Sequence, residues 1–122
     1  MEVPRELEPW LPAPGWSGAE ADALLLPVID MDVGQLVWQL DLPFWAGRDG
    51  QPFQVRPLDV VDGPHLELVE REDCTLPLDV TWQNGRWIVL DGLHRLLKAA
   101  RAGLTVLPAR VVPPEAIRQL AA

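Results

Sequence analysis

An Asn-Gly pair between two apolar stretches is the feature that most limits how this chain can fold. Leu78–Gln83 and Arg86–Leu90 flank Asn84-Gly85, the dipeptide that best suits a tight type I′ turn between two strands. Three cross-strand pairs follow from such a turn: Trp82 with Trp87, Val80 with Val89, and Thr81 with Ile88. The sequence therefore predicts a β-hairpin in which two adjacent tryptophans cover a face of the core.

A helix and another strand are predicted directly after the hairpin. Four residues recur at helical spacing and give this helix one apolar face: Leu93, Leu96, Leu97 and Ala100. Gly103 stands where a left-handed cap would end the helix, and the strand follows over 106–112. Strand, helix and strand at this spacing suggest a crossover unit, with a mixed sheet as the alternative. The predicted fold class is α+β with α/β-like order, a small mixed β-sheet with short helices.

Only short elements are predicted before the hairpin, because thirteen prolines in 122 residues leave little room for long helices. In chain order, these elements are a strand at Leu36–Leu40, a hairpin over 44–55 turning at Asp49-Gly50, a helical piece at 56–59, a break at Gly63-Pro64 and a helix over His65–Glu72. At the other end of the chain, a terminal helix is predicted from Pro113 to about Leu120. Residues 1–30 are predicted to form a proline-rich arm that packs through Trp10 or Trp16, or stays mobile. Residues 31–122 form the predicted domain.

The overall charge and the single cysteine narrow the classes of function. The formal net charge is -8, so the chain lacks the basic excess with which nucleic-acid-binding proteins neutralise phosphates. Cys74 is the only cysteine, which excludes an intramolecular disulfide and fits a reducing compartment. The acidic N-terminus is unlike a signal peptide, and the apolar run Ala23–Ile29 is too short to span a bilayer. We expect a cytoplasmic protein whose main partner is neither nucleic acid nor a membrane.

The turn Asp91–Arg95 holds the residues best suited to chemistry. A helix start exposes unpaired backbone N–H groups and a partial positive charge, which together attract a phosphate. Gly92 leaves the approach open, and His94 and Arg95 add an imidazole and a guanidinium within the first turn. This pattern predicts an anion site at the start of the helix.

The same residues also have a structural explanation that needs no ligand. Asp91 is a preferred N-cap residue, and Asp-Gly suits a tight turn. Lys98 and Arg101 continue the cationic stripe, but charges on a solvent-facing side of a helix are ordinary. The pattern alone leaves both explanations open.

A family resemblance adds to this pattern. Trp87–Leu96, followed by Ala99-Ala100, Gly103-Leu104 and Val106–Val112, resembles the nucleotide-binding core of the ParB/sulfiredoxin superfamily, which has a strand, a D-G-x-H-R turn, a helix, a glycine and a further strand. Leu76–Val80 resembles the strand that precedes this core. The match covers about 76–112 well, covers 34–75 only loosely, and does not include 1–30.

The resemblance implies a site for ATP, ADP or CTP, usually with magnesium. Carried over by position, the contacts to the nucleoside di- or triphosphate are Gly92, Leu93, His94 and Arg95, with Lys98 beside them. Asp91 would be a magnesium contact or a proton acceptor, which makes Asp91 and His94 the catalytic candidates at the turn. Free-amino-acid kinases of this superfamily add an acidic catalytic residue upstream, and Glu67, close after His65, is the nearest candidate.

Departures from the superfamily's patterns narrow the choice of activity. Sulfiredoxins need a cysteine between the glycine and the histidine of the turn, where this chain has Leu93, and Cys74 belongs to a different element. Sulfiredoxin chemistry is therefore not expected. Chromosome-partition ParB proteins have a turn richer in arginine and a downstream helix-turn-helix domain, for which the ten residues after Val112 leave no room.

The other candidate residues have simpler explanations. His65 and His94 could form a metal pair, but their spacing matches no ligand motif, and a histidine such as His65 is typical of a surface or cap position. Cys74 follows Asp73 and gains no cation that would stabilise a thiolate, so a structural role is expected.

Three classes of function remain open. The leading hypothesis is a nucleotide-binding domain that acts on a small-molecule acceptor as a kinase, or on its nucleotide as a hydrolase. The second is a non-catalytic binding or regulatory module of the same fold, with the N-terminal arm as a contact for a protein partner. The third is a DNA-acting nuclease, against which the acidic charge argues.

Overall fold

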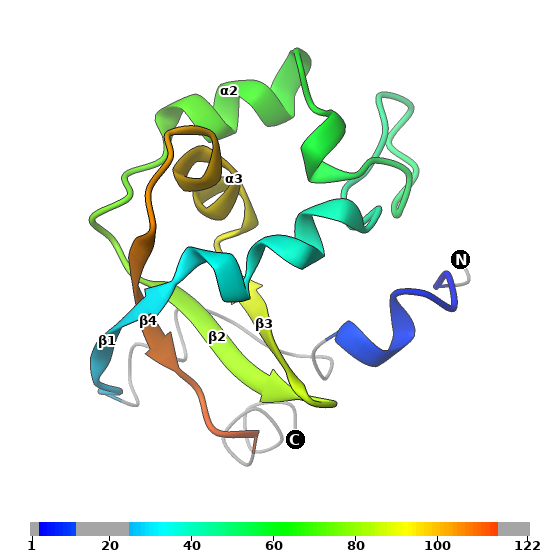
Figure 1. The fold of residues 1–122 in the computed structure, drawn as a ribbon. Helices are drawn as coiled ribbons and strands as arrows, with labels where there is room; N and C mark the ends of the chain where they lie inside the picture. Colours follow the sequence, from blue (N-terminus) through cyan, green and yellow to red (C-terminus); the bar gives the residue numbers. More distant parts are fainter. Residues whose placement is uncertain (1–2, 12–24, 115–122) are drawn as a thin grey trace.

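The computed structural model describes residues 3–11 and 25–114 (Figure 1). These ranges contain strands β1 (Val28–Asp32), β2 (Leu78–Gln83), β3 (Arg86–Asp91) and β4 (Val106–Val111), helices α2 (Gly63–Arg71) and α3 (Leu93–Arg101), and the short 3-10 helices η1 (Glu8–Trp10), η2 (Val33–Gln35), η3 (Val37–Asp41) and η4 (Pro57–Asp59). Within the described ranges, neither α-helix is long and apolar enough to cross a membrane.

The four strands form one mixed sheet in the order β1-β4-β2-β3. β2 and β3 are the predicted antiparallel hairpin, with all three expected pairs in register. β4 lies on the other side of β2 and runs parallel to it, so α3 carries the chain from one edge strand to the middle of the sheet. β1 pairs antiparallel with β4 at the opposite edge. The α+β class with a small mixed sheet is confirmed.

The main core lies between the sheet and the two α-helices, which pack together on one side of it (Figure 1). The predicted apolar face of α3 is confirmed, since Leu96 and Leu97 are fully buried and Leu93 and Ala100 pack against the same core. Gly103 ends the helix with φ 75°, and the N–H of Leu104 donates to a carbonyl of the last turn, as expected of a left-handed cap.

The two tryptophans of the hairpin contact each other edge to face, with ring centroids 5.2 Å apart. Trp87 packs against the core, whereas Trp82 remains half exposed at 51%. The expectation that both rings cover the core is therefore correct for Trp87 and wrong for Trp82. Trp82 lies one position from the hairpin turn, at the end of β2 where the buried pattern of the strand stops.

The predicted strand at Leu36–Leu40 is wrong, because this segment forms η2 and η3. Val33, Leu36 and Leu40 are all buried, and their spacing of three and four residues suits helical turns better than a strand. An alternation over so few residues does not separate the two conformations. Pro43 follows closely, and the extended backbone that a proline imposes on the residue before it ends the turns at Leu42.

Two further predictions for the segment before β2 differ from the structure. The hairpin predicted over 44–55 is reduced to a single bridge between Trp45 and Val55, since Pro43 and Pro52 have no N–H for a longer ladder. Gly63-Pro64 does separate η4 from the next helix, but both residues belong to the first turn of α2. The helical piece at 56–59 and the helix after it are confirmed.

Gln39 of η3 closes the outer edge of β3. Its side chain, 1% exposed, accepts the N–H of Val89 at 2.9 Å and donates to the carbonyl of Trp87 at 3.3 Å. These are the two backbone groups that a neighbouring strand would pair with. One amide side chain therefore satisfies two backbone groups of an edge strand.

The described part of the arm lies against the hairpin. Leu7 is fully buried, and Trp10 meets Trp38 edge to face at 4.8 Å, so the expected packing through Trp10 is confirmed. The side chains of Gln83 and Asn84 both donate to the carbonyl of Pro9 at 2.7 Å. Trp16 and the predicted terminal helix lie outside the described residues.

Candidate functional site

The candidate site begins where β3 ends and α3 starts. Gly92, with φ 119°, is the N-cap residue, and no side chain caps the helix. The alternative role of Asp91 as N-cap is therefore wrong, and its side chain lies exposed at the end of β3. A Cβ at residue 92 would lie 2.5 Å from Cδ2 of Leu78, and φ 119° is a conformation that side-chain-bearing residues rarely adopt, so glycine is favoured here whether or not a ligand binds.

Arg95, a predicted phosphate contact, is engaged by the protein itself. Its Nη2 donates to Oε2 of Glu72 and its Nη1 to the carbonyl of Pro77, both at 2.9 Å. The side chain is 16% exposed. Its Nε is buried without a partner among the described residues, which is an unusual position for a guanidinium nitrogen. Arg95 joins the start of α3 to the segment after α2.

The other cations of α3 also contact backbone carbonyls. Lys98 donates to the carbonyls of Glu70 and Glu72 at 2.9 and 2.7 Å, where the unpaired carbonyls at the end of α2 need donors. Arg101 donates to the carbonyl of Val60, after η4, at 2.5 Å. The cationic stripe is therefore not a row of free solvent-facing charges. It fastens α3 to α2 and η4.

His94 is paired with His65, the other histidine of the chain. Nδ1 of His65 lies 3.1 Å from Nε2 of His94, and Nε2 of His65 lies 3.0 Å from the carbonyl oxygen of Ala46. The expectation of a surface or cap role for His65 is wrong, because its ring is half-buried between these two partners. The spacing of the two histidines along the chain carried no sign of this contact.

Both imidazoles stack on Trp45, which is almost fully buried. The ring centroids of His65 and His94 lie 4.6 and 4.2 Å from that of Trp45, at interplanar angles of 10° and 12°. The two imidazole centroids are only 5.4 Å apart, so the rings lie side by side on one face of the indole rather than on opposite faces. Trp45 thus fixes the plane of the histidine pair.

The surroundings of His94 disfavour its charged form. Burial lowers the pKa of His94, and the neighbouring His65 lowers it further, while the carboxylates of Glu72 and Asp91 act in the opposite direction. The net effect is a pKa below the ordinary value of 6.5. At neutral pH His94 is therefore an uncharged imidazole and not a cation.

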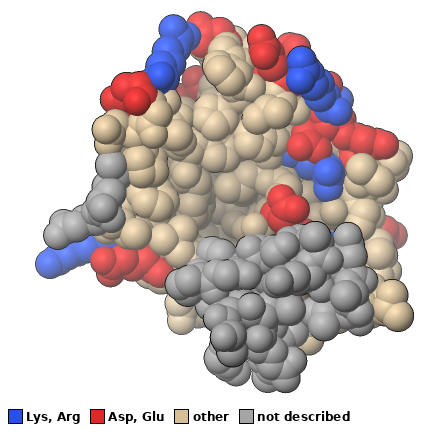
Figure 2. All heavy atoms as spheres, turned by 180° about the vertical axis from the view of Figure 1, so that it is seen from behind, with Lys and Arg blue, Asp and Glu red and all other residues tan. Residues whose placement is uncertain are grey.

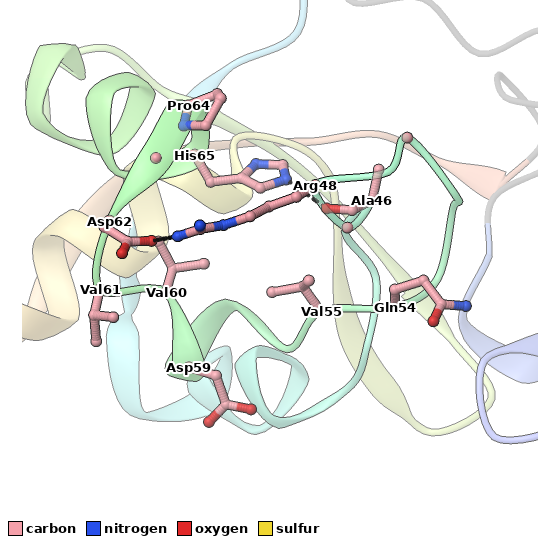
Figure 3. Close-up of a pocket in the computed structure, with 13 residues that line it drawn as sticks. Ala46, Arg48, Gln54, Val55, Asp59, Val60, Val61, Asp62, Pro64 and His65 are labelled. Carbon is pink, nitrogen blue, oxygen red and sulfur yellow. Dashed lines mark hydrogen bonds and ion pairs between the residues drawn. The ribbon is translucent and has the colours of Figure 1, made fainter.

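A cavity of about 440 Å³ lies beside this pair, between the loop at 46–50, η4 and the start of α2 (Figure 3). Val55, Val60 and Pro64 contribute apolar wall. The side chain of Arg48 reaches across the cavity to an ion pair with Asp62, the N-cap residue of α2 (Figure 3). His65 forms part of the wall, and its contact with His94 connects the cavity to the start of α3. The volume is in the range of roughly 300–1,000 Å³ that small-molecule sites occupy.

The remaining sequence candidates lie in different surroundings. Leu93 packs its side chain against the core, so only its backbone faces the helix start. Glu67 is exposed on α2, two positions from His65, and side chains so spaced on a helix point in different directions. Among the described residues, no group of three or more His, Cys, Asp or Glu side chains is placed to hold a metal ion.

The charged side chains do not form a basic face. Figure 2, seen from the side opposite to Figure 1, shows Lys and Arg next to Asp and Glu around the edge, while uncharged residues occupy the hollowed middle. This distribution agrees with the net charge of -8 and offers no continuous track for a phosphate backbone on the described part of this face.

Comparisons with known proteins find a likeness to solved structures. No protein-family model and no curated protein matches the chain. A sulfiredoxin from Arabidopsis thaliana aligns with 79% of this chain and 98% of its own, at 13% sequence identity and a TM-score of 0.43. A likeness at this identity and score does not place the chain in a family.

Proposed function

We propose that this chain is a nucleotide-binding domain of the ParB/sulfiredoxin type, with the phosphates at the start of α3. The observation that carries the proposal is the uncapped start of this helix next to His94. Its first backbone N–H groups have no side-chain partner, and such groups, together with the helix dipole, attract an anion. The nucleoside would extend past His65 into the cavity of about 440 Å³.

Magnesium would enter with the nucleotide rather than reside in the protein. Mg²⁺ commonly uses one or two carboxylates together with phosphate oxygens and water. The exposed carboxylate of Asp91, at the end of β3, would supply the protein ligand. Glu67 is not part of the proposed site, because its side chain lies on the exposed side of α2.

A phosphate contact through Nη2 of Arg95 would compete with the carboxylate of Glu72. A phosphate would then take the place of the carboxylate. Binding would be weakened by the free energy of the ion pair between Arg95 and Glu72, which has to be broken first. Glu72→Gln removes the competing charge and keeps the size of the side chain. If Arg95 is a phosphate contact, this variant should bind the nucleotide several-fold more tightly than the wild type. Unchanged affinity would remove Arg95 from the site.

Calorimetric titration with ATP, ADP and CTP in the presence of magnesium tests the proposal. We expect the wild type to bind at least one of them. Val61→Trp, at the exposed rim of the cavity, should weaken binding about tenfold or more by occupying the space. Leu58→Trp is the matched control, because Leu58 is half exposed on η4 but does not line the cavity. No binding by the folded wild type would overturn the proposal.

A second candidate is a non-catalytic module of the same fold. The observation that favours it is the engagement of Arg95 and Lys98 by Glu72 and by the end of α2, which leaves fewer cations to stabilise a phosphoryl transition state. Measuring phosphate release from the bound nucleotide over hours distinguishes the enzyme from the non-catalytic module. Nucleotide that is bound but never consumed favours the module, whereas turnover favours the enzyme.

A further inference from the structure

The hydrogen bonds of the histidine pair determine which nitrogen carries each proton. A carbonyl oxygen only accepts, so Nε2 of His65, 3.0 Å from the carbonyl of Ala46, must carry a hydrogen and donate it. A neutral imidazole has one N–H, which leaves Nδ1 of His65 with a free lone pair. That lone pair lies 3.1 Å from Nε2 of His94, which must therefore be the donor of the bond between the rings.

The same rule applied to His94 leaves its Nδ1 without a hydrogen in the neutral ring. This nitrogen makes no hydrogen bond with the described residues. Among these residues, the fully buried side-chain atoms without a partner are Nε1 of Trp38 and Nε of Arg95, so Nδ1 of His94 is not fully buried. Nδ1 of His94 is therefore a lone pair that a ligand or water can reach, on a residue in the first turn of α3. Trp45 holds the ring in place by stacking on it at 4.2 Å.

We infer that His65 is a positioning residue that keeps His94 as a neutral imidazole whose Nδ1 accepts a proton at the start of α3. The charged groups around His94 are Glu72 after α2 and Asp91 at the end of β3, and the ring itself is held by His65 of α2. A neutral ring repels a phosphate oxygen at Nδ1, because both carry lone pairs. His94 is thus a base facing the reacting hydroxyl and not a cationic clamp on the phosphate.

The role as base rests on the proposed function, which supplies the nucleoside triphosphate. The co-reactant is a hydroxyl group, either of water or of an alcohol on a small acceptor. As its oxygen bonds to the terminal phosphorus, the O–H bond breaks and its proton moves to Nδ1 of His94. The bond between that phosphorus and the bridging oxygen breaks, and the nucleoside diphosphate leaves with the electron pair.

Long-range ¹H–¹⁵N NMR tests the positioning without any nucleotide, because the chain has only two histidines. At neutral pH we expect both rings to carry hydrogen on Nε2 and not on Nδ1. His65→Leu should release His94 into a mixture of tautomers, whereas His65→Gln, whose side-chain oxygen can accept the N–H of His94, should keep the single form. A wild-type His94 with hydrogen on Nδ1, or one that His65→Leu leaves unchanged, would overturn the inference.

Turnover of the triphosphate tests the chemical role. We expect His65→Leu to lower kcat by about tenfold to a hundredfold, and His65→Gln to restore most of the loss. The acidic limb of the kcat profile should follow the titration of His94 seen by NMR. A kcat unaffected by His94→Gln would overturn the role as base. Failure of the wild type to bind nucleotide would overturn the role of His94 as base together with the proposed function. The NMR measurement of the histidine tautomers would still test whether His65 positions His94.

Discussion

Nη2 of Arg95 lies 2.9 Å from Oε2 of Glu72, and this ion pair joins the first turn of α3 to the residue that ends α2. Both side chains are mostly buried, at 16% and 25% exposure, so solvent screens the pair less than it would at the surface. The guanidinium of Arg95, which the sequence predicts to contact a phosphate, thus also links α3 to the end of α2. Its contributions to stability and to binding have to be measured separately.

Arg95→Ala should lower the free energy of unfolding by about 1–3 kcal/mol, because Glu72 and the carbonyl of Pro77 both lose a donor. Denaturant unfolding measures this change. Arg71→Ala, an exposed arginine of α2, is the matched control and should stay within about 0.5 kcal/mol of the wild type. Equal stabilities for the two variants would show that the ion pair contributes nothing.

Acidification should destabilise the protein in two separate windows. Because the pKa of His94 is below its ordinary value of 6.5 in the folded chain, the unfolded chain takes up a proton first as the pH falls. The free energy of unfolding should therefore fall as the pH is lowered from 6.5 through the folded pKa. The pKa of Asp59 is lowered by Arg56, so that contribution is lost only below 3.8. Urea titrations at a series of pH values measure both.

His94→Gln provides the control for the first window. Its stability can differ from that of the wild type at every pH, but the slope between neutral pH and about pH 5 should become flatter. The decline below 3.8 should remain, since Asp59 is unchanged. A slope equal to that of the wild type near pH 6 would contradict the lowered pKa of His94.

Gly92→Ala should cost more than about 2 kcal/mol of stability. The new Cβ would lie 2.5 Å from Cδ2 of Leu78, and φ 119° is unfavourable for any residue with a side chain. Gly34→Ala is the control, since a methyl group there would meet no atom within 4 Å and the φ of Gly34 is not in the left-handed range. Thermal unfolding compares them, and similar midpoints would rule out the close contact with β2.

Leu7→Ala tests how firmly the arm is attached. Leu7 is fully buried, and truncating a buried leucine commonly costs about 2–5 kcal/mol. Glu8→Ala changes the exposed neighbour and should have little effect. If both variants unfold at the wild-type denaturant concentration, residues 3–11 do not contribute to the stability of the folded domain.

The sequence predicted the elements that depend on neighbouring residues. Asn84-Gly85 sets the hairpin register by the geometry of its turn, and the leucines of α3 set its buried face by helical period. Both signals lie within a dozen residues, so they can be read without knowing the rest of the chain. The 3-10 turns at 33–41 were missed because Leu36 and Leu40 fit an alternating pattern as well as a helical one.

The contacts around the candidate site could not be predicted, because they are made across the fold. His65 and His94 are 29 positions apart, and no local pattern indicates that they share a hydrogen bond over Trp45. Glu72 likewise carries no local sign that it binds Arg95. The sequence predicts a site at the turn 91–95, but the lowered pKa of His94 depends on burial and on His65 of another helix.

The amide of Gln39 has a consequence for how this protein behaves in a concentrated solution. An open strand edge is a template on which a second molecule can continue the sheet, and repeated addition leads to fibrils. The side chain of Gln39 already hydrogen-bonds the carbonyl of Trp87 and the N–H of Val89, so a second strand cannot pair with β3 at these two groups. Detachment of η3 would expose the carbonyl of Trp87 and the N–H of Val89 to the backbone of a second molecule.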